Sequence, residues 1–144
     1  MSPESSALVR STWSEIAPRT DEVSRDFYAR LFELDPEARA LFDGTDMDAL
    51  RAKFMHTIAT MVAVLDDPGV LVSESVPLGR RHGGYGVRAR DYELAGTALM
   101  DALERVLGDR WTRETRDAWR ELYALLAGVM MRAGGAQGAG ATRG

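Results

Sequence analysis

Apolar side chains recur every three or four positions along most of the chain, which is the spacing of an amphipathic helix. The first such segment follows Ser2 and Pro3, a capping residue and a first-turn proline, and it ends at Pro18. A second helical segment begins at Thr20 and carries its aromatic residues on one face. No segment shows the two-residue alternation that is typical of a half-buried strand. The pattern therefore predicts an all-α chain.

Further helices are expected between residue 35 and the glycine-rich C-terminus. One of them is weaker because Pro77 interrupts it, and His82 lies at its end, directly before a glycine-rich turn. We expect about seven helices in one domain over residues 1–133, and a flexible Gly-rich tail over residues 134–144. The approximate bounds of the five later helices are 35–42, 46–66, 70–81, 91–107 and 112–132.

Charge and composition exclude several classes of protein. The formal net charge is -4 and no basic stripe is present, so a nucleic-acid partner is not expected. The chain has no cysteine, which excludes disulfides, zinc knuckles, a cysteine nucleophile and a thiolate-ligated haem. No apolar run approaches the roughly 20 residues of a membrane span, and the N-terminus lacks the features of a secretory signal. A soluble, cytoplasmic protein without a membrane partner is expected.

The two histidines differ in their surroundings. His56 follows Phe54 by two positions on a helix, so it is rotated about 200° from that apolar face and is expected at the surface. His82 stands between an apolar segment and a glycine-rich turn, where a side chain can point inward while the backbone departs. Taken alone, a histidine in this place is more often a helix cap or a surface residue than a ligand.

Several aromatic residues occur in a specific order. Trp13 lies in the first helix, and Phe42 follows ten residues after Phe32. The remaining motifs are Tyr28-Ala29-Arg30-Leu31-Phe32, Leu78-Gly79-Arg80-Arg81-His82 before Tyr85-Gly86-Val87, and Trp119 with Tyr123. In this order and spacing the chain resembles the globin family over about residues 5–132. The segment around His82 is similar to the proximal segment of bacterial single-domain globins, flavohaemoglobin haem domains and neuroglobin-like proteins.

The resemblance implies haem b, iron protoporphyrin IX, as the cofactor. His82 would be the metal ligand through Nε2, with its Nδ1 proton held by a backbone carbonyl near Leu78. Phe42 would lie against the porphyrin face, and Lys53 and Arg81 would reach the haem propionates. For the apolar residues, ordinary core packing stays open as an alternative. The remaining residues expected to bind the cofactor are Leu50, Phe54, Leu78, Tyr85, Val87, Tyr92, Leu99 and Met130, with Ala95 as a further wall residue.

On the distal side the chain departs from the family pattern. Leu50 stands where many globins carry His or Gln, and leucine can neither ligate iron nor donate a hydrogen bond. The chain has no Asn, and its only Gln is Gln137 in the tail. Tyr28 is therefore the expected hydrogen-bond donor to a bound gas, and Phe54 is expected to limit the size of the ligand. Tyr28, Leu50 and Phe54 form the expected ligand-binding set.

The function implied by the resemblance is reversible binding of dioxygen, carbon monoxide or nitric oxide. An enzyme is the alternative, either a nitric oxide dioxygenase that uses a separate reductase or a peroxidase-like catalyst. Tyr92, ten residues after His82, matches a tyrosine of flavohaemoglobins, but the glutamate expected near residues 133–136 is absent. This absence favours ligand binding. A sensor, or a globin-like fold without haem, are further readings, and the protein is expected to be a monomer or a homodimer.

Overall fold

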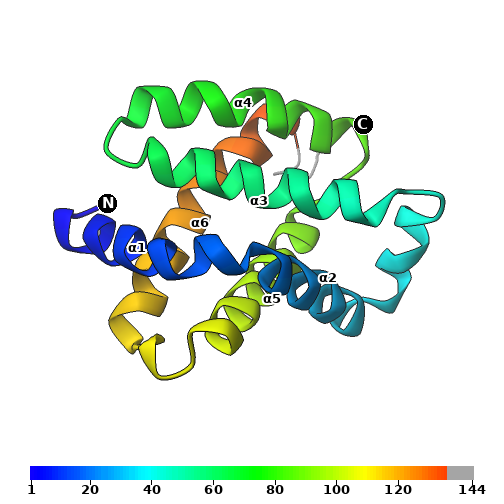
Figure 1. The fold of residues 1–144 in the computed structure, drawn as a ribbon. Helices are drawn as coiled ribbons and strands as arrows, with labels where there is room; N and C mark the ends of the chain where they lie inside the picture. Colours follow the sequence, from blue (N-terminus) through cyan, green and yellow to red (C-terminus); the bar gives the residue numbers. More distant parts are fainter. Residues whose placement is uncertain (136–144) are drawn as a thin grey trace.

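The computed structural model describes residues 1–135, and within them it contains helices and no strand. The all-α prediction is confirmed (Figure 1). Three 3₁₀ segments connect the helices, at Ala17–Arg19, Pro36–Phe42 and Gly108–Arg110. The expected tail falls almost entirely on residues 136–144, which lie outside the described part. The α-helices are α1 Pro3–Ile16, α2 Thr20–Leu34, α3 Met47–Ala63, α4 Pro68–Gly84, α5 Ala89–Leu107 and α6 Arg113–Gly134.

Side-chain caps fix the starts of several helices. The Ser2 hydroxyl accepts a hydrogen bond from the Ser5 amide at 3.0 Å, and the predicted cap at α1 is thereby confirmed. The predicted cap of α6 by Thr112 is confirmed in the same way. Asp35 occupies the N-cap position of the third helix, as predicted, but its side chain makes no capping hydrogen bond. The third predicted helix, expected at residues 35–42, is a 3₁₀ helix at Pro36–Phe42. Together with the six α-helices it makes up the seven helices that the sequence predicted.

The helix α4 is longer than the sequence indicated. It begins at Pro68 and continues through Pro77 to Gly84. Proline is tolerated in the first turn because the N–H that it lacks would have no partner within the helix there. Asp67 caps it by accepting a hydrogen bond from the Val70 amide. The glycines after His82 were expected to break the helix at once, but two of them extend it. His82 consequently lies inside the last turn of α4, where the helix controls the orientation of its ring.

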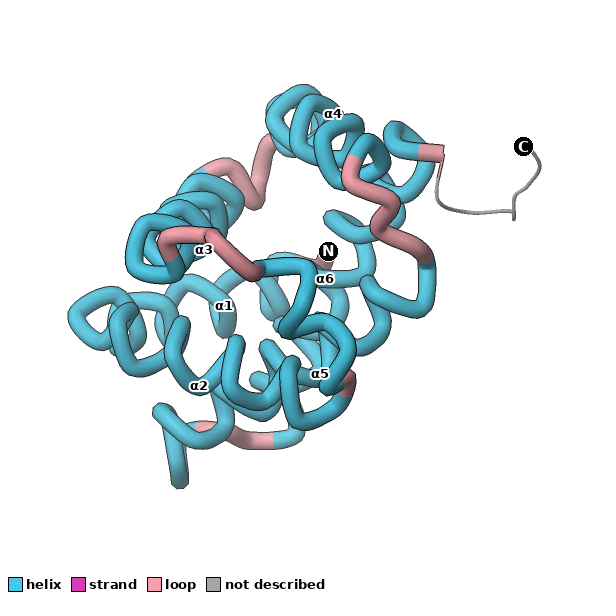
Figure 2. Tube along the Cα trace, turned by 90° about the vertical axis from the view of Figure 1, so that its right-hand side faces the viewer, coloured by secondary structure: helices cyan, strands magenta, loops and turns pink. Residues whose placement is uncertain are grey.

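Consecutive helices in the middle of the chain pack against different partners. Helix α2 packs on α5, helix α3 packs chiefly on α2, and helix α4 packs on α6. Figure 2 shows the same arrangement, with α3 toward α1 and α2 and α4 toward α6. Within the described residues the buried apolar side chains form two separate clusters rather than one. The larger cluster joins α1, α2, α3, α5 and α6. The smaller one joins α4 to α6, to the start of α5 and to Met61 near the end of α3.

Helices α1 and α6, from opposite ends of the chain, are joined by a buried hydrogen bond. The Trp119 indole is 1% exposed, and its N–H donates to the Thr12 hydroxyl at 2.9 Å. Thr12 in turn donates to the Leu8 carbonyl at 2.7 Å, so none of these polar groups is buried without a partner. The Trp13 ring lies 6.5 Å from the Trp119 ring. These contacts hold the first and last helices of the fold together.

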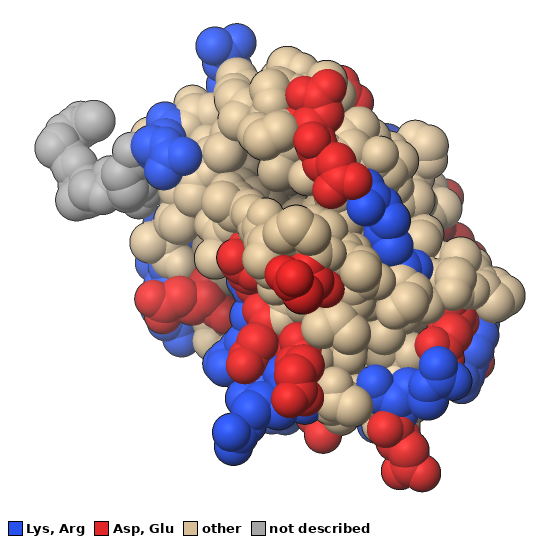
Figure 3. All heavy atoms as spheres, turned by 90° about the vertical axis from the view of Figure 1, so that its left-hand side faces the viewer, with Lys and Arg blue, Asp and Glu red and all other residues tan. Residues whose placement is uncertain are grey.

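The surface carries charges of both signs. Figure 3 shows acidic and basic side chains intermixed on one face of the molecule, with no continuous basic area there. Of the helices between residues 1 and 135, none has the combined length and apolar character that crossing a membrane requires.

Candidate functional site

The His82 imidazole is oriented by its own helix. Its Nδ1 lies 2.7 Å from the carbonyl oxygen of Leu78, one turn earlier in α4. A carbonyl can only accept a hydrogen bond, so Nδ1 carries a proton, and in the neutral imidazole Nε2 then presents a lone pair. The hydrogen bond near Leu78 that the sequence analysis expected is therefore present. A neutral imidazole fixed in this tautomer is the form in which histidine binds a metal.

Two glycines bring α4 into backbone contact with α6. A Cβ atom on Gly79 would stand 2.6 Å from the Cα of Met130, and one on Gly83 would stand 2.6 Å from the Cα of Gly134. Ordinary carbon contacts are 3.5 to 4.0 Å, so no side chain fits at either position. His82 lies between these two contacts in the sequence. The sequence analysis missed this role of the glycines, although their spacing, Gly79-x-x-x-Gly83, was a visible signal.

Tyr92 at the start of α5 is the aromatic neighbour of His82. The two ring centroids are 6.2 Å apart, at an angle of 31° between the planes. Burial raises the pKa of the Tyr92 hydroxyl, and the Tyr123 O–H donates to the Tyr92 carbonyl at 2.6 Å. Leu78, Val87 and Met130 belong to the same apolar cluster as Tyr92. Four of the predicted site residues are thus brought together on the side of the fold that carries His82.

Tyr28 on α2 lies among aromatic rings in the larger apolar cluster, whereas Leu78 and Tyr92 beside His82 belong to the smaller one. Its side chain is 8% exposed, and its ring meets those of Phe42 and Phe54 edge to face, each at 5.9 Å between centroids. Phe54 also stacks on Phe27 at 4.2 Å. These contacts place Tyr28, Phe42 and Phe54 in one group. Leu50, Leu99 and Ala95 pack in the same cluster.

The Tyr28 hydroxyl stays protonated at neutral pH. Burial raises its pKa to about 12, because the phenolate would lose its hydration, and the positive charge of Arg51 opposes this shift. The phenol is consequently available to donate its hydrogen to a group outside the chain.

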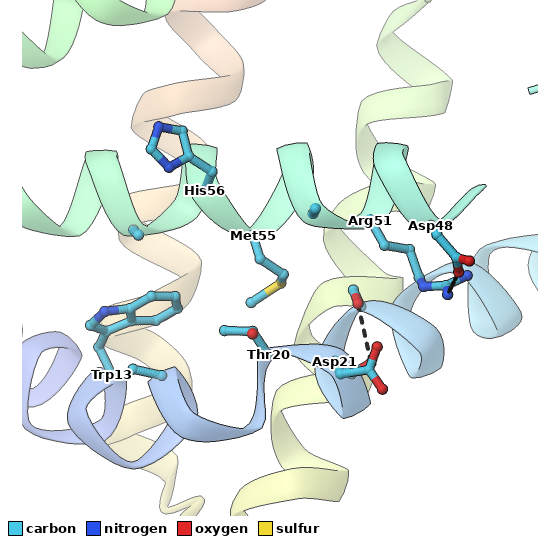
Figure 4. Close-up of a pocket in the computed structure, with 11 residues that line it drawn as sticks. Trp13, Thr20, Asp21, Asp48, Arg51, Met55 and His56 are labelled. Carbon is cyan, nitrogen blue, oxygen red and sulfur yellow. Dashed lines mark hydrogen bonds and ion pairs between the residues drawn. The ribbon is translucent and has the colours of Figure 1, made fainter. Parts of the chain in front are cut away.

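The charged and exposed members of the predicted set are not brought into these clusters. Lys53 and Arg81 are exposed, as expected for side chains that would reach the edge of a pocket. Tyr85 is 82% exposed and joins neither cluster, so the structure gives its predicted role no support. His56 is exposed, and Figure 4 shows it on the side of α3 away from Trp13 and Met55. The prediction that His56 is a surface residue is confirmed.

Arg51 on α3 is a half-buried cation that lies outside the predicted set of site residues. Its side chain is 20% exposed and pairs with Asp48, but its Nε is buried without a hydrogen-bond partner. It lines a hollow of about 550 Å³ between α1, α2 and α3 (Figure 4). Nothing in the sequence indicates that this side chain is half-buried, because an arginine on a helix is usually solvated.

The residues present fit haem by the chemistry of their donor set. His82 offers one neutral nitrogen ligand, and the Leu78 carbonyl fixes which nitrogen that is. The apolar and aromatic residues of the two clusters suit the face of a porphyrin. Lys53 and Arg81 lie at the surface. There they could pair with the haem propionates, whose carboxylate groups would remain in water. The fold and the site together define an all-α haem-binding protein.

Comparison with known proteins gives the family. The Globin family model matches residues 25–130. The flavohemoproteins of Xylella fastidiosa (strain 9a5c) and Bordetella pertussis are 34% and 33% identical to the chain. The alignments cover 90% and 91% of this chain but only 33% of each relative, so the chain spans about a third of their length. Neuroglobin of Tetraodon nigroviridis is 30% identical over 92% of this chain and 91% of its own. The chain belongs to the globin family, and the family expected from the sequence is confirmed.

Proposed function

We propose that this globin reversibly binds dioxygen or another diatomic gas on haem b, with His82 as the proximal ligand and Tyr28 as the distal hydrogen-bond donor. The observation that carries the proposal is the hydrogen bond from His82 Nδ1 to the Leu78 carbonyl, which leaves Nε2 free to ligate. Haem supplies the ferrous iron to which the gas binds. The chain supplies the axial ligand, the apolar walls and the distal donor.

On the proximal side, the Leu78 carbonyl prevents the imidazole from rotating and keeps its proton on Nδ1. A ligand held in this way needs no reorganisation when it binds iron. The α4 backbone is itself held against α6 at Gly79 and Gly83, so the position of His82 relative to α6 is fixed. Tyr92 covers one side of the ring and limits its movement.

On the distal side, Tyr28 donates its O–H to the gas, and Phe42 and Phe54 exclude water around it. A donor is worth most for dioxygen, which carries partial negative charge on its outer atom when it is bound. Leu50 cannot act as a second axial ligand, and His56 is exposed on the other side of α3. The ferrous iron is therefore expected to be five-coordinate without gas.

The test is the absorption spectrum of purified protein in the ferric, ferrous and carbon monoxide-bound states. Wild-type protein is expected to show a Soret band and a broad five-coordinate ferrous spectrum. His82→Ala is expected to lose most of its haem, and added imidazole is expected to restore a ligated spectrum. His56→Ala is the matched control and should behave as wild type. Normal haem content and an unchanged carbon monoxide spectrum in His82→Ala would refute the proximal assignment.

Oxidation of nitric oxide by dioxygen, with an electron from a separate cytoplasmic reductase, is the alternative function. The flavohemoprotein relatives and the position of Tyr92 beside His82 support it. It is less favoured, because residues 133–135 at the end of α6 contain no carboxylate to polarise the proximal imidazole. Nitric oxide consumption with a chemical reductant, measured beside the rate of gas release, separates the two functions.

A further inference from the structure

Helices α1, α2 and α3 surround a hollow that the candidate haem site does not use. Its volume of about 550 Å³ lies within the range of pockets that hold small molecules. Small side chains leave the space open, since Ala17 follows α1 and two alanines lie on α3. On α3, Ala52, Met55 and Ala59 occupy positions i, i+3 and i+7, so one face of this helix lines the hollow. None of the residues that line it belongs to the set predicted to bind haem or gas.

The hollow has an aromatic end and a charged end. Figure 4 shows Trp13 at one end, Met55 in the middle and Arg51 at the other end. Arg51 and Ala59 are eight residues apart on α3, so the hollow extends about 12 Å along this helix. An indole ring and a thioether sulfur favour contact with an aromatic ring, and a guanidinium favours a carboxylate. The arrangement therefore suits a ligand that carries aromatic rings at one end and a carboxylate at the other.

The guanidinium of Arg51 lies at the charged end with one donor unused. Its side chain is 20% exposed, and its Nη2 pairs with the carboxylate of Asp48. Within residues 1–135 its Nε–H meets no acceptor, and this atom is buried from water as well. A buried donor without an acceptor is unfavourable, because it has lost its hydration and gained no hydrogen bond. A ligand that supplies an acceptor to Arg51 would remove this cost, which favours its binding.

Both acidic residues that line the hollow already have a cationic partner. Asp21 pairs with Arg25, one turn along α2, at 2.9 Å. Asp48 pairs with Arg51, but its side chain is 87% exposed. An ion pair with so exposed a partner contributes little to stability, and the Asp48 carboxylate can return to water at small cost. Asp48 therefore occupies the position that the carboxylate of a ligand would take, and a ligand competes with it for Arg51.

We propose that this hollow binds an aromatic carboxylate, with Arg51 as the anchor for the carboxylate and with Trp13 and Met55 as the contacts for the rings. On binding, Arg51 leaves Asp48 and turns its Nε toward the hollow. The planar guanidinium then offers Nε–H and Nη2–H side by side, which matches the two oxygens of a carboxylate. Because Ala52 is exposed, the hollow is open to water and part of the ligand stays solvated. A dissociation constant on the order of millimolar is expected for a ligand of two rings.

An NMR titration of the carbon monoxide-bound holoprotein with 2-naphthoate tests the proposal. Carbon monoxide occupies the iron, so the probe cannot bind there, and the indole N–H signal of Trp13 is expected to shift while that of Trp111 stays in place. The uncharged analogue 2-naphthamide should bind about tenfold more weakly. Arg51→Met keeps a side chain of similar length without the charge, and should weaken naphthoate binding by about the same factor. Asp48→Asn should strengthen it, because the competing carboxylate is removed.

Two further variants complete the test. Ala52→Leu fills the hollow from an exposed position, so binding should be lost while the fold is kept. Arg105→Met is the matched control, since Arg105 also pairs with an aspartate but does not line the hollow. No shift of Trp13 at probe concentrations on the order of ten millimolar would overturn the proposal. Equal affinities for naphthoate and naphthamide, unchanged binding in Arg51→Met, or weaker binding in Asp48→Asn would overturn it as well. The Soret spectrum of the same samples reports haem binding separately, so gas binding and the hollow are judged independently.

Discussion

The two sides of the candidate haem site are built differently. On the side of α4, backbone meets backbone at Gly79 and Gly83, and the ligand His82 is fixed by a hydrogen bond to its own helix. On the side of α3, aromatic side chains pack around the ring of Tyr28. Backbone contacts tolerate no added atom, whereas side-chain packing can adjust through rotamers. The proximal side should therefore be rigid and the distal side adaptable.

The largest expected effect is at the backbone contact. Gly79→Ala places a methyl group against the Met130 backbone, which cannot rotate away, and should lower the free energy of unfolding by about 3 kcal/mol. Moving α4 away from α6 should also displace His82 and speed haem loss. Denaturant unfolding and the rate of haem transfer to an acceptor protein measure the two effects.

Gly84→Ala is the control for this prediction. Gly84 lies in the same helix, close to His82, and a Cβ there would meet no heavy atom within 4 Å. Alanine should be neutral or slightly stabilising at this position. Equal stability and equal haem retention in the two variants would show that the α4–α6 contact does not determine the position of His82.

The next effect concerns alkaline pH. The pKa of Tyr28 is raised by burial to about 12, above the ordinary value of 10.0. The raised value means that the folded state holds the phenolic proton more tightly, so this contribution to stability is complete below pH 10 and is lost as the pH rises toward 12. A two-unit shift corresponds to about 2 to 3 kcal/mol. Between pH 8 and pH 12 the free energy of unfolding should decrease less for Tyr28→Phe than for wild type. Tyr85→Phe is the control and should show the same decrease as wild type.

The smallest effect is on gas release. Tyr28→Phe removes the distal donor, and a hydrogen bond of about 1 to 1.5 kcal/mol corresponds to a fivefold to tenfold faster release of dioxygen. Carbon monoxide carries little charge on its outer atom, so its release should change less. Stopped-flow rates for both gases, with Tyr85→Phe as the control, make the measurement. Equal small changes for the two gases would identify Tyr28 as a packing residue.

Much of this architecture could be predicted from the sequence because it depends on local pattern. Periodic apolar residues and the caps Ser2 and Thr112 are properties of short segments, and the structure agrees with them. Gly83 and Gly84 misled the prediction for the end of α4, since glycine weakens a helix in isolation but less so in one that packs along its length on α6. The hydrogen bond of His82 to Leu78 was predictable because its partners are one turn apart.

What the sequence could not predict depends on residues that are distant along the chain. Whether a glycine marks a turn or a close contact depends on what lies opposite, and for Gly79 that is Met130. The burial of Arg51 likewise follows from how α1 and α2 cover α3. Tyr85 shows the reverse case, since a residue that matched a family motif is exposed. Local sequence patterns identified the candidate site residues, and tertiary packing determined how far each is buried and what it contacts.

The hydrogen bond between Trp119 and Thr12 has a consequence for the order of events during synthesis. Its partners are 107 residues apart, so α1 emerges from the ribosome long before the helix on which it packs. At roughly 5 to 20 residues per second, the nascent N-terminal helix waits about 5 to 20 s for that partner. During this interval the apolar face of α1 is without its final cover and is a natural substrate for a chaperone that binds nascent chains.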